Sequence, residues 1–150
     1  MPRVTRKRMI SADVGAVWQL ISDPYNLPRW WPRAGRVENV EGKSGGKRSQ
    51  WTKVLETAEG RGVRADYRCI SSAEGERYVW EQELEGTPFA RHLRSSRVEI
   101  GLKDREGETL VNLASVQTLK GMSRMGSPMM RRAQGAILDE ALDGIERALT

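Results

Sequence analysis

Cysteine and histidine are almost absent from this chain of 150 residues, which holds one of each, Cys69 and His92. A single cysteine cannot close an internal disulfide, and one cysteine with one histidine is too small a set for a zinc site. We therefore expect no metal, no other cofactor and a reducing, cytoplasmic setting. A Gly-x-Ser-x-Gly elbow is also missing, so a serine nucleophile has little support.

Long apolar runs are missing as well. No segment approaches the roughly 18 apolar residues that a transmembrane helix needs. The opening "MPRVTRKRMI" is basic but has no apolar stretch behind it, which argues against a signal peptide. Without repeats, linkers or low-complexity tracts, the chain is expected to form a single domain over residues 1–150.

Positive charge is in excess, with a formal net charge of +5. Basic residues outnumber acidic ones by 14 to 8 in residues 1–75, whereas residues 76–150 hold 11 and 12. A basic half can attract phosphate or an anionic surface, but these arginines are scattered between acids, as on a solvated face. We expect no specific nucleic-acid partner and a monomer or homodimer.

The run "GKSGGKR" at residues 42–48 is interpreted as a hairpin turn, because it lacks the spacing of a phosphate-binding loop.

The first forty residues predict a strand and two short helices. Residues 3–10 alternate loosely as a strand, and Ser11 is a candidate cap for the helix that follows, with Asp13 in its first turn. Apolar residues at spacings of three and four form one helical face: Val14, Val17, Trp18 and Ile21. Asp23-Pro24 ends this helix, and the prolines of residues 24–31 leave room only for a short second piece.

The middle of the chain changes to a period of two. Five segments separated by glycine-rich or charged turns are strand-like: "SQWTKVLE", "RGVRADYRCI", "ERYVWEQELEG", "RHLRSSRVEIGLK" and "ETLVNLASVQTL". Alternation assigns an inner, apolar and aromatic face to Val63, Ala65, Tyr67, Cys69, Tyr78, Trp80, Gln82 and Leu84. The first segment is ambiguous, because Trp51 and Leu55 share a side with Lys53. An antiparallel sheet covered on one face follows from this pattern.

A long amphipathic helix ends the sequence. Ser127-Pro128 supplies a capping hydroxyl and a proline at the first helical position. The predicted buried stripe is Met130, Ala133, Ile137, Ala141, Ile145 and Ala148, flanked by Leu138, Leu142 and Leu149. About twenty helical residues span about 30 Å, enough to cross a sheet. The fold class is therefore α+β, a curved antiparallel sheet of about six to seven strands wrapped around one helix, with a gap between them.

The stretch "ADVGAVWQLISDPYNLPRWWP" resembles the opening helices of the START-like, or polyketide cyclase/dehydrase-like, superfamily with the helix-grip, birch-pollen-allergen-like fold. "GETLVNLASVQTLKG" is similar to the last strand of that family, so the resemblance covers nearly the whole chain in element order. It implies an internal cavity for a small hydrophobic ligand, such as a lipid, quinone or polyketide-like molecule. Because the family also contains aromatase/cyclases, the resemblance leaves a carrier and an enzyme open.

Candidate ligand contacts come from the inner faces and from the ends of the gap. They are Trp30, Trp31, Tyr67, Tyr78, Trp80, Gln82, Ser96, Gln117, Met122, Met125, Met130, Ala133 and Ile137. Each tryptophan of the Trp30–Trp31 pair could be a structural plug or a ligand contact. Inward Gln82 and Gln117 indicate either a pocket with polar handles or hydrogen bonds between strands. Met122, Met125 and Met130 could form an adaptable lid before the last helix, or ordinary core.

Catalysis, if present, would centre on His92, the one side chain that titrates unperturbed near neutral pH. His92, Arg94 and Ser96 share parity with apolar residues further along the strand, which would place them inward as a row for an anionic or carbonyl group. The alternative is a twist or bulge that leaves His92 and Arg94 at the solvent edge. The sequence keeps both orientations open, and with them the choice between a carrier and a cyclase or dehydratase that uses His92 as acid and base.

Overall fold

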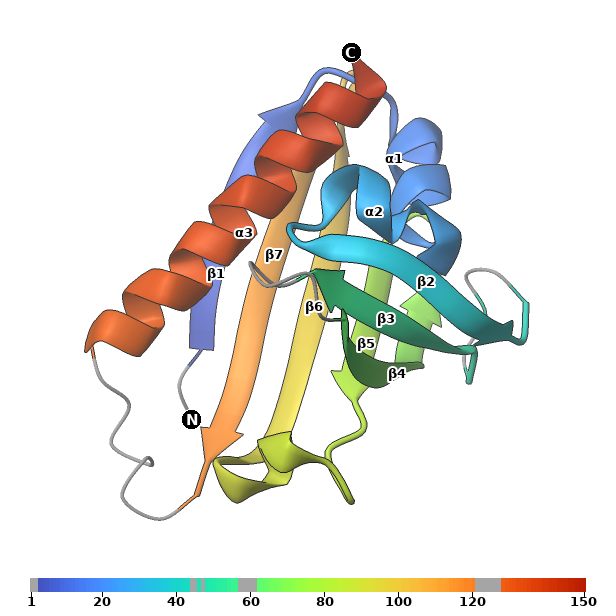
Figure 1. The fold of residues 1–150 in the computed structure, drawn as a ribbon. Coiled ribbons are helices and arrows are strands. Elements are labelled where there is room, and N and C mark those ends of the chain that lie inside the picture. The colour runs from blue at the N-terminus through green and yellow to red at the C-terminus, as the bar shows by residue number, and fades with distance from the viewer. Residues whose placement is uncertain (1–2, 44–45, 47, 57–61, 121–127) are drawn as a thin grey trace.

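The computed structural model describes residues 3–43, 46, 48–56, 62–120 and 128–150, with the backbone alone for Leu55, Glu56 and Gly62. Along the chain the elements are β1 (Arg3–Ile10), α1 (Val14–Ile21), the 3-10 turn η1 (Pro24–Asn26), α2 (Leu27–Trp30), β2 (Ala34–Glu41), β3 (Gln50–Glu56), β4 (Gly62–Ala73), β5 (Arg77–Gln82), the 3-10 turn η2 (Pro88–Arg91), β6 (Leu93–Arg105), β7 (Glu108–Leu119) and α3 (Pro128–Leu149). Figure 1 shows α3 lying across the sheet with α1 and α2 beside one end of it.

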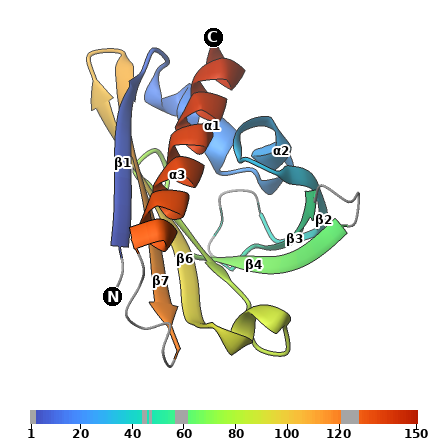
Figure 2. The same ribbon diagram turned by 60° about the vertical axis from the view of Figure 1, so that its left-hand side comes forward.

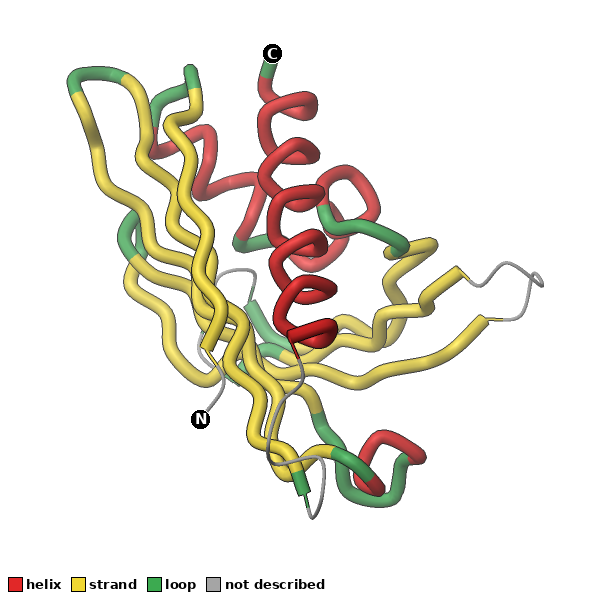
Figure 3. Tube along the Cα trace, turned by 90° about the vertical axis from the view of Figure 1, so that its left-hand side faces the viewer, coloured by secondary structure: helices red, strands yellow, loops and turns green. Residues whose placement is uncertain are grey.

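The seven strands form one antiparallel sheet in the order β1-β7-β6-β5-β4-β3-β2. The sheet curves around α3, and the part made by β2, β3 and β4 turns away from the other strands, toward the right in Figures 2 and 3. One layer of sheet and one long helix therefore face each other, with α1 and α2 beside one end of the sheet (Figure 1). This is the helix-grip arrangement that the order of elements predicted.

Strand β2 was not among the segments that the alternation identified. Its sequence "AGRVENVE" has no clear apolar face, and Asn39 has a positive φ of 54°. Its pairing with β3 is interrupted twice, between Ala34 and Arg36 and between Glu38 and Glu41. Bulges of this kind break the period of two, so an irregular edge strand gives little sequence signal.

The N-cap of helix α1 lies two residues later than predicted. Asp13 is the N-cap residue, and its carboxylate accepts a hydrogen bond from the Ala16 N–H at 2.8 Å. The assignment of Ser11 as the cap was wrong, because Asp13 has the extended backbone of a cap and a side chain that reaches the third helical N–H. At the other end, Asp23 caps η1 by accepting from the Tyr25 N–H at 3.0 Å.

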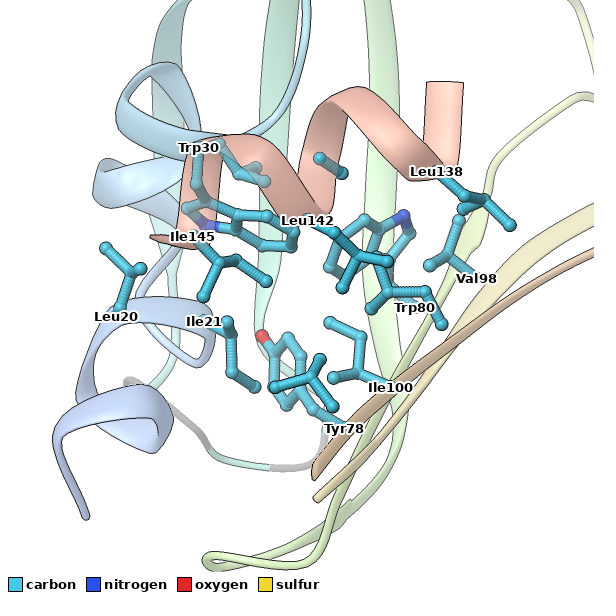
Figure 4. Close-up of a cluster of buried hydrophobic side chains, with 14 of the residues drawn as sticks. Leu20, Ile21, Trp30, Tyr78, Trp80, Val98, Ile100, Leu138, Leu142 and Ile145 are labelled. Atoms are coloured by element: carbon cyan, nitrogen blue, oxygen red, sulfur yellow. The ribbon is translucent and has the colours of Figure 1, made fainter. Parts of the chain in front are cut away.

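Trp30, from the proline-rich segment of residues 24–32, belongs to the core. It is buried under α3, where it contacts the rings of Trp80 and Trp31 at centroid distances of 6.0 and 5.5 Å. Figure 4 shows Trp30 and Trp80 beside Leu142 of α3. A Cβ on Gly144 would meet the backbone of Trp30, so this glycine allows α3 and α2 to pack closely.

Three predicted core positions, Val63, Met130 and Ala133, are wrong. Val63, the second residue of β4, is 38% exposed where it pairs with Leu55 of β3. The buried side of α3 is also rotated from the predicted stripe toward its leucine flank, and it consists of Gly135, Leu138, Ala141, Leu142, Gly144 and Ile145. Met130 and Ala133 are exposed instead.

Ion pairs occupy much of the other face of the sheet. Arg68 pairs with Glu81 and Glu83, Arg64 and Arg36 pair with Glu38, and Arg3 and Arg97 pair with Glu99. Among the described residues, no helix is long and apolar enough to span a membrane. Five of the arginines are thus paired with neighbouring carboxylates, as expected of a solvated surface.

Candidate functional site

A cavity of about 500 Å³ lies between the concave face of the sheet and α3. Its walls come from the α2–β2 connection, from five strands, from η2 and from the first half of α3. The lining residues are Trp31, Pro32, Arg33, Lys53, Tyr67, Trp80, Gln82, Phe89, Leu93, Ser96, Arg97, Val98, Ser115, Gln117, Ala133, Gln134, Ala136, Ile137, Leu138 and Glu140. A volume of this size is in the range of pockets that hold small organic molecules.

Aromatic rings form one wall of the cavity. Trp80 on β5 and Trp31 after α2 meet edge to face with centroids 5.3 Å apart. Tyr67 on β4 stacks on Trp51 of β3, with 13° between the ring planes and centroids 6.1 Å apart. These contacts hold rigid rings at the cavity surface, where they offer flat apolar area at a small cost in conformational entropy.

Polar side chains cross the sheet in a row along the cavity floor. Ser96 on β6 is paired with Gln117 on β7, and the Gln117 amide donates to the Ser96 hydroxyl at 3.4 Å. Two residue pairs further along the strands, the Ser115 hydroxyl donates to Gln134 of α3 at 2.8 Å. For Gln117, the interpretation as a hydrogen bond between strands is therefore confirmed, and this bond lies in the cavity wall.

Lys53 is the most unusual residue of the site. It lies on β3, its side chain lines the cavity, and only 4% of its surface is exposed. Its ammonium nitrogen is 4.6 Å from the ring centroid of Tyr67 and 5.1 Å from that of Trp31, so it sits between two aromatic faces. Among the side chains that the structure describes, no carboxylate forms an ion pair with it.

Burial lowers the pKa of Lys53 from 10.5 to about 7. The cause is desolvation, since a charged ammonium loses its hydration in this apolar surrounding and no described carboxylate compensates for the loss. Burial also raises the pKa of the Tyr67 phenol above its usual range, so that this hydroxyl stays protonated at neutral pH. The cavity therefore presents an amine that changes charge near pH 7 beside a neutral phenol.

Most of the predicted ligand contacts lie around this one cavity. Trp31, Tyr67, Trp80, Gln82, Ser96, Gln117, Ala133 and Ile137 all line it. Trp30 and Tyr78 do not: Trp30 packs behind Trp31, and Tyr78 is buried against the rings of Trp18 and Trp51. In the Trp30–Trp31 pair, the first tryptophan is thus the plug and the second the wall residue.

Only part of the methionine-rich segment, residues 120–130, lies among the residues that the structure describes. Met122 and Met125 lie outside the described residues. Met130, in the first turn of α3, is 37% exposed and lines a small pocket with Val4 and Gln117 rather than the main cavity. The lid formed by residues 120–130 stays a prediction.

His92 and Arg94 are exposed and do not line the cavity. The pairing of β6 with β7 passes from Leu93 and Leu119 directly to Ser95 and Thr118, so Arg94 is the extra residue of a bulge. Alternation is reversed there, and Leu93 takes the inward position that parity had given to His92 and Arg94. The inward orientation was wrong, and the bulged alternative is the one observed.

Sequence reasoning missed several lining residues. Phe89 and Leu93 were hidden by η2 and by the bulge, and Arg33 lies in a connection with a positive φ of 62°. Lys53 had a usable signal, since it shares its side of the strand with Trp51, which is 2% exposed. Within the described parts of the chain, no three histidine, cysteine, aspartate or glutamate residues come together as a metal site.

Comparisons with known proteins agree with this geometry. The sequence matches, over residues 1–150, the family described as polyketide cyclase / dehydrase and lipid transport. No curated protein matches it. The curved sheet that grips a C-terminal helix is the START-like fold, and the chain belongs to the polyketide cyclase / dehydrase and lipid transport family.

Solved structures with this fold include a START superfamily protein from Mycobacterium smegmatis, with a TM-score of 0.77, 15% identity and coverage of 98% of this chain and 96% of that one. A protein from Thermus thermophilus is similar with a TM-score of 0.75, 18% identity and coverage of 99% and 97%. The di-domain ARO/CYC BexL from the BE-7585A biosynthetic pathway has a TM-score of 0.76 and 17% identity over 98% of this chain and 46% of its own. At these identities the likeness shows the fold.

Proposed function

We propose that this protein binds a small, mostly apolar molecule in the cavity between the sheet and α3, and that it acts as a carrier or binding protein for a lipid-, quinone- or polyketide-like ligand. The observation that carries the proposal is the cavity itself, about 500 Å³ in volume and walled by aromatic rings. Membership of a family described by polyketide cyclisation and lipid transport supports the same class of ligand. A cytoplasmic location and a monomeric or homodimeric state are part of this proposal.

The chemistry of the walls supports an amphipathic ligand rather than a pure hydrocarbon. Trp31, Trp80 and Phe89 offer apolar contact, whereas Ser96 and Gln117 offer hydrogen bonds. A site of this composition fixes the orientation of a ligand through a few polar groups and gains most of its affinity from apolar burial.

Binding can be measured with N-phenyl-1-naphthylamine, a neutral apolar dye whose fluorescence rises in a dry site. We expect saturable binding at one site per chain, together with quenching of tryptophan emission. Native mass spectrometry of freshly purified protein would in addition show a co-purifying small molecule. Absence of saturable dye binding and of any retained molecule would refute the proposal.

A matched pair of variants on α3 locates the site. Ala133 lines the cavity, whereas Met129 is 78% exposed and does not line it, and both side chains lie at the surface of the helix. Ala133→Phe should weaken dye binding about 5- to 10-fold, equivalent to about 1–1.4 kcal/mol, because the phenyl ring takes part of the volume. Met129→Phe should leave the affinity unchanged. Equal effects of the two would place the dye elsewhere.

The alternative function is that of a polyketide aromatase/cyclase or dehydratase. His92 does not support it, because this residue is exposed and outside the cavity. A reaction inside the cavity would have to use another group, and Lys53 with Tyr67 is the titratable pair that the cavity wall offers. Activity through this pair would leave the rate unchanged in His92→Gln.

A further inference from the structure

We propose that Lys53 is a nucleophilic amine, and that the cavity takes ligands with a ketone or aldehyde carbonyl, which Lys53 captures as an imine. This inference rests on the proposed function, since the carbonyl compound must first bind in the cavity. It adds a covalent chemistry and a substrate class to that function.

The first support is the position of the amine. Lys53 lines the cavity, and its nitrogen lies 4.6 and 5.1 Å from the ring centroids of Tyr67 and Trp31. The two rings restrict the side chain, so the amine stays at the wall of the space that the ligand would fill. An ordinary surface lysine has no such restriction and is surrounded by water.

The second support is the charge environment of Lys53 among the described side chains. A buried lysine normally pairs with a carboxylate, because an unpaired ammonium in an apolar site is strongly unfavourable. No described carboxylate pairs with Lys53, and burial lowers its pKa to about 7. About half of the amine is then neutral at pH 7, compared with about one part in 3,000 for a lysine with the ordinary pKa. Desolvation of this kind is a known way to make lysine a nucleophile.

The reaction balances without any other reagent. The lone pair of the Lys53 nitrogen attacks the carbonyl carbon, and the carbonyl π electrons move to oxygen. Both protons of the neutral amine end on that oxygen, which leaves as water while the C=N bond forms. Carbon and nitrogen keep their oxidation states, so the step consumes a carbonyl and an amine and yields an imine and one water.

The other charged and titratable groups in the cavity wall are Arg33, Tyr67, Arg97 and Glu140. Tyr67 stays protonated at neutral pH because burial raises the pKa of its phenol. Arg97 pairs with Glu99 at 2.8 Å, so its charge is matched by a neighbouring carboxylate. Lys53 is thus the group in this wall whose deprotonation near pH 7 creates a nucleophile, and the rate of imine formation should rise between pH 6 and pH 8.

The test uses 2-naphthaldehyde as the carbonyl probe and sodium cyanoborohydride to reduce the imine to a stable amine. Intact-mass analysis and peptide mapping then give the extent of labelling at each lysine. The internal references are Lys7, Lys43, Lys103 and Lys120, which are exposed. The α-amino group of the purified chain is also reactive near pH 7, and peptide mapping separates it from Lys53.

We expect labelling of Lys53 at least 10-fold faster than labelling of the exposed lysines at pH 7, and competition by 2-naphthalenemethanol. This alcohol has the same ring system but no carbonyl, so it binds the cavity without forming an imine. Lys53→Met should lose the fast labelling while it still binds the alcohol, as measured by quenching of tryptophan fluorescence.

The outcomes separate the two proposals. Binding of the alcohol together with slow, uniform labelling of all lysines would refute the imine and leave the binding function intact. Failure of the alcohol, the aldehyde and N-phenyl-1-naphthylamine to bind would refute both. Fast labelling at Lys53 that the alcohol does not block would refute capture inside the cavity. The wild-type peptide map alone decides the matter if the variant does not fold.

Discussion

Replacement of Lys53 by methionine should stabilise the protein, by an amount that depends on pH. Methionine is close to lysine in length and apolar along its whole side chain, so it can occupy the slot between Trp31 and Tyr67. It removes the requirement that the buried group lose a proton or its hydration when the chain folds. The free energy of unfolding of Lys53→Met should therefore exceed that of the wild type near neutral pH.

The size of the effect follows from the two pKa values. Lys53 has a pKa of about 7 when folded and an ordinary value of 10.5 when unfolded. At about 1.4 kcal/mol for each pKa unit, this difference corresponds to roughly 4–5 kcal/mol of lost stability at pH 7 and below. At pH 9 the remaining difference corresponds to roughly 2 kcal/mol.

The sign is that of a base whose pKa is lower in the folded state. Between pH 7 and pH 10.5 the unfolded chain binds more protons than the folded one, so the wild type gains stability as the pH rises through this window. Lys53→Met lacks the group and lacks this gain. The advantage of the variant should consequently shrink by roughly 2 kcal/mol between pH 7 and pH 9 and vanish above pH 10.5.

Urea denaturation at pH 6, 7, 8 and 9, followed by tryptophan fluorescence, measures the difference directly. Lys103→Met, a change at an exposed lysine of β6, is the control and should differ from the wild type by less than about 0.5 kcal/mol at every pH. A Lys53→Met difference that does not change with pH, or a variant less stable than the wild type throughout, would refute the neutral buried amine. The nucleophile proposal would then lose its chemical basis.

Three further predictions use matched variants. Gly144→Ala should destabilise the protein by roughly 1–3 kcal/mol in urea denaturation, because its Cβ would meet the Trp30 backbone. In Gly135→Ala the new Cβ meets only the movable end of Arg6, so this variant should stay within about 1 kcal/mol of the wild type, and similar losses in both variants would contradict the close packing of α2 on α3. In urea denaturation, Trp30→Ala should cost roughly 3–5 kcal/mol of stability, while Trp31→Ala should mainly weaken N-phenyl-1-naphthylamine binding in a dye titration. The reverse pattern would make Trp31 the core residue and Trp30 the ligand contact. His92→Gln should leave the dye affinity within about twofold of the wild type, and a larger loss would place His92 at the site after all.

The regular elements were predictable because hydrophobic periodicity is a local property. Residues 3–10, the helix with Val17 and Trp18 on one face, and the long last helix all appear as predicted. Ala65, Tyr67 and Cys69 on β4 are buried while Arg64 and Arg68 are exposed, as alternation requires. Element order then restricts the fold to a sheet curled around one helix.

The sequence-based predictions failed where the backbone of a strand is irregular. The bulge at Arg94 changes which side chains point inward, and nothing in "RHLRSSRVEI" marks the extra residue. The same is true of the interrupted strand β2, whose pairing skips residues at two points. Both features arise from how neighbouring strands fit together, so they are properties of the pair and not of either segment.

Lys53 is a position whose burial the sequence left ambiguous. Alternation puts Lys53 on the same side of its strand as Trp51, which favours burial, whereas a charged side chain favours exposure. These two rules conflict at this position. The tertiary structure resolves the conflict: the pairing of β3 with β4 brings Tyr67 beside Lys53, and the chain after α2 brings Trp31 over it, so the amine lies against rings from two other segments. Positions where local rules disagree are often functional, because stability alone gives no reason to bury an unpaired cation. The lysine that fits the fold least well is accordingly the residue on which we base the chemistry of the cavity.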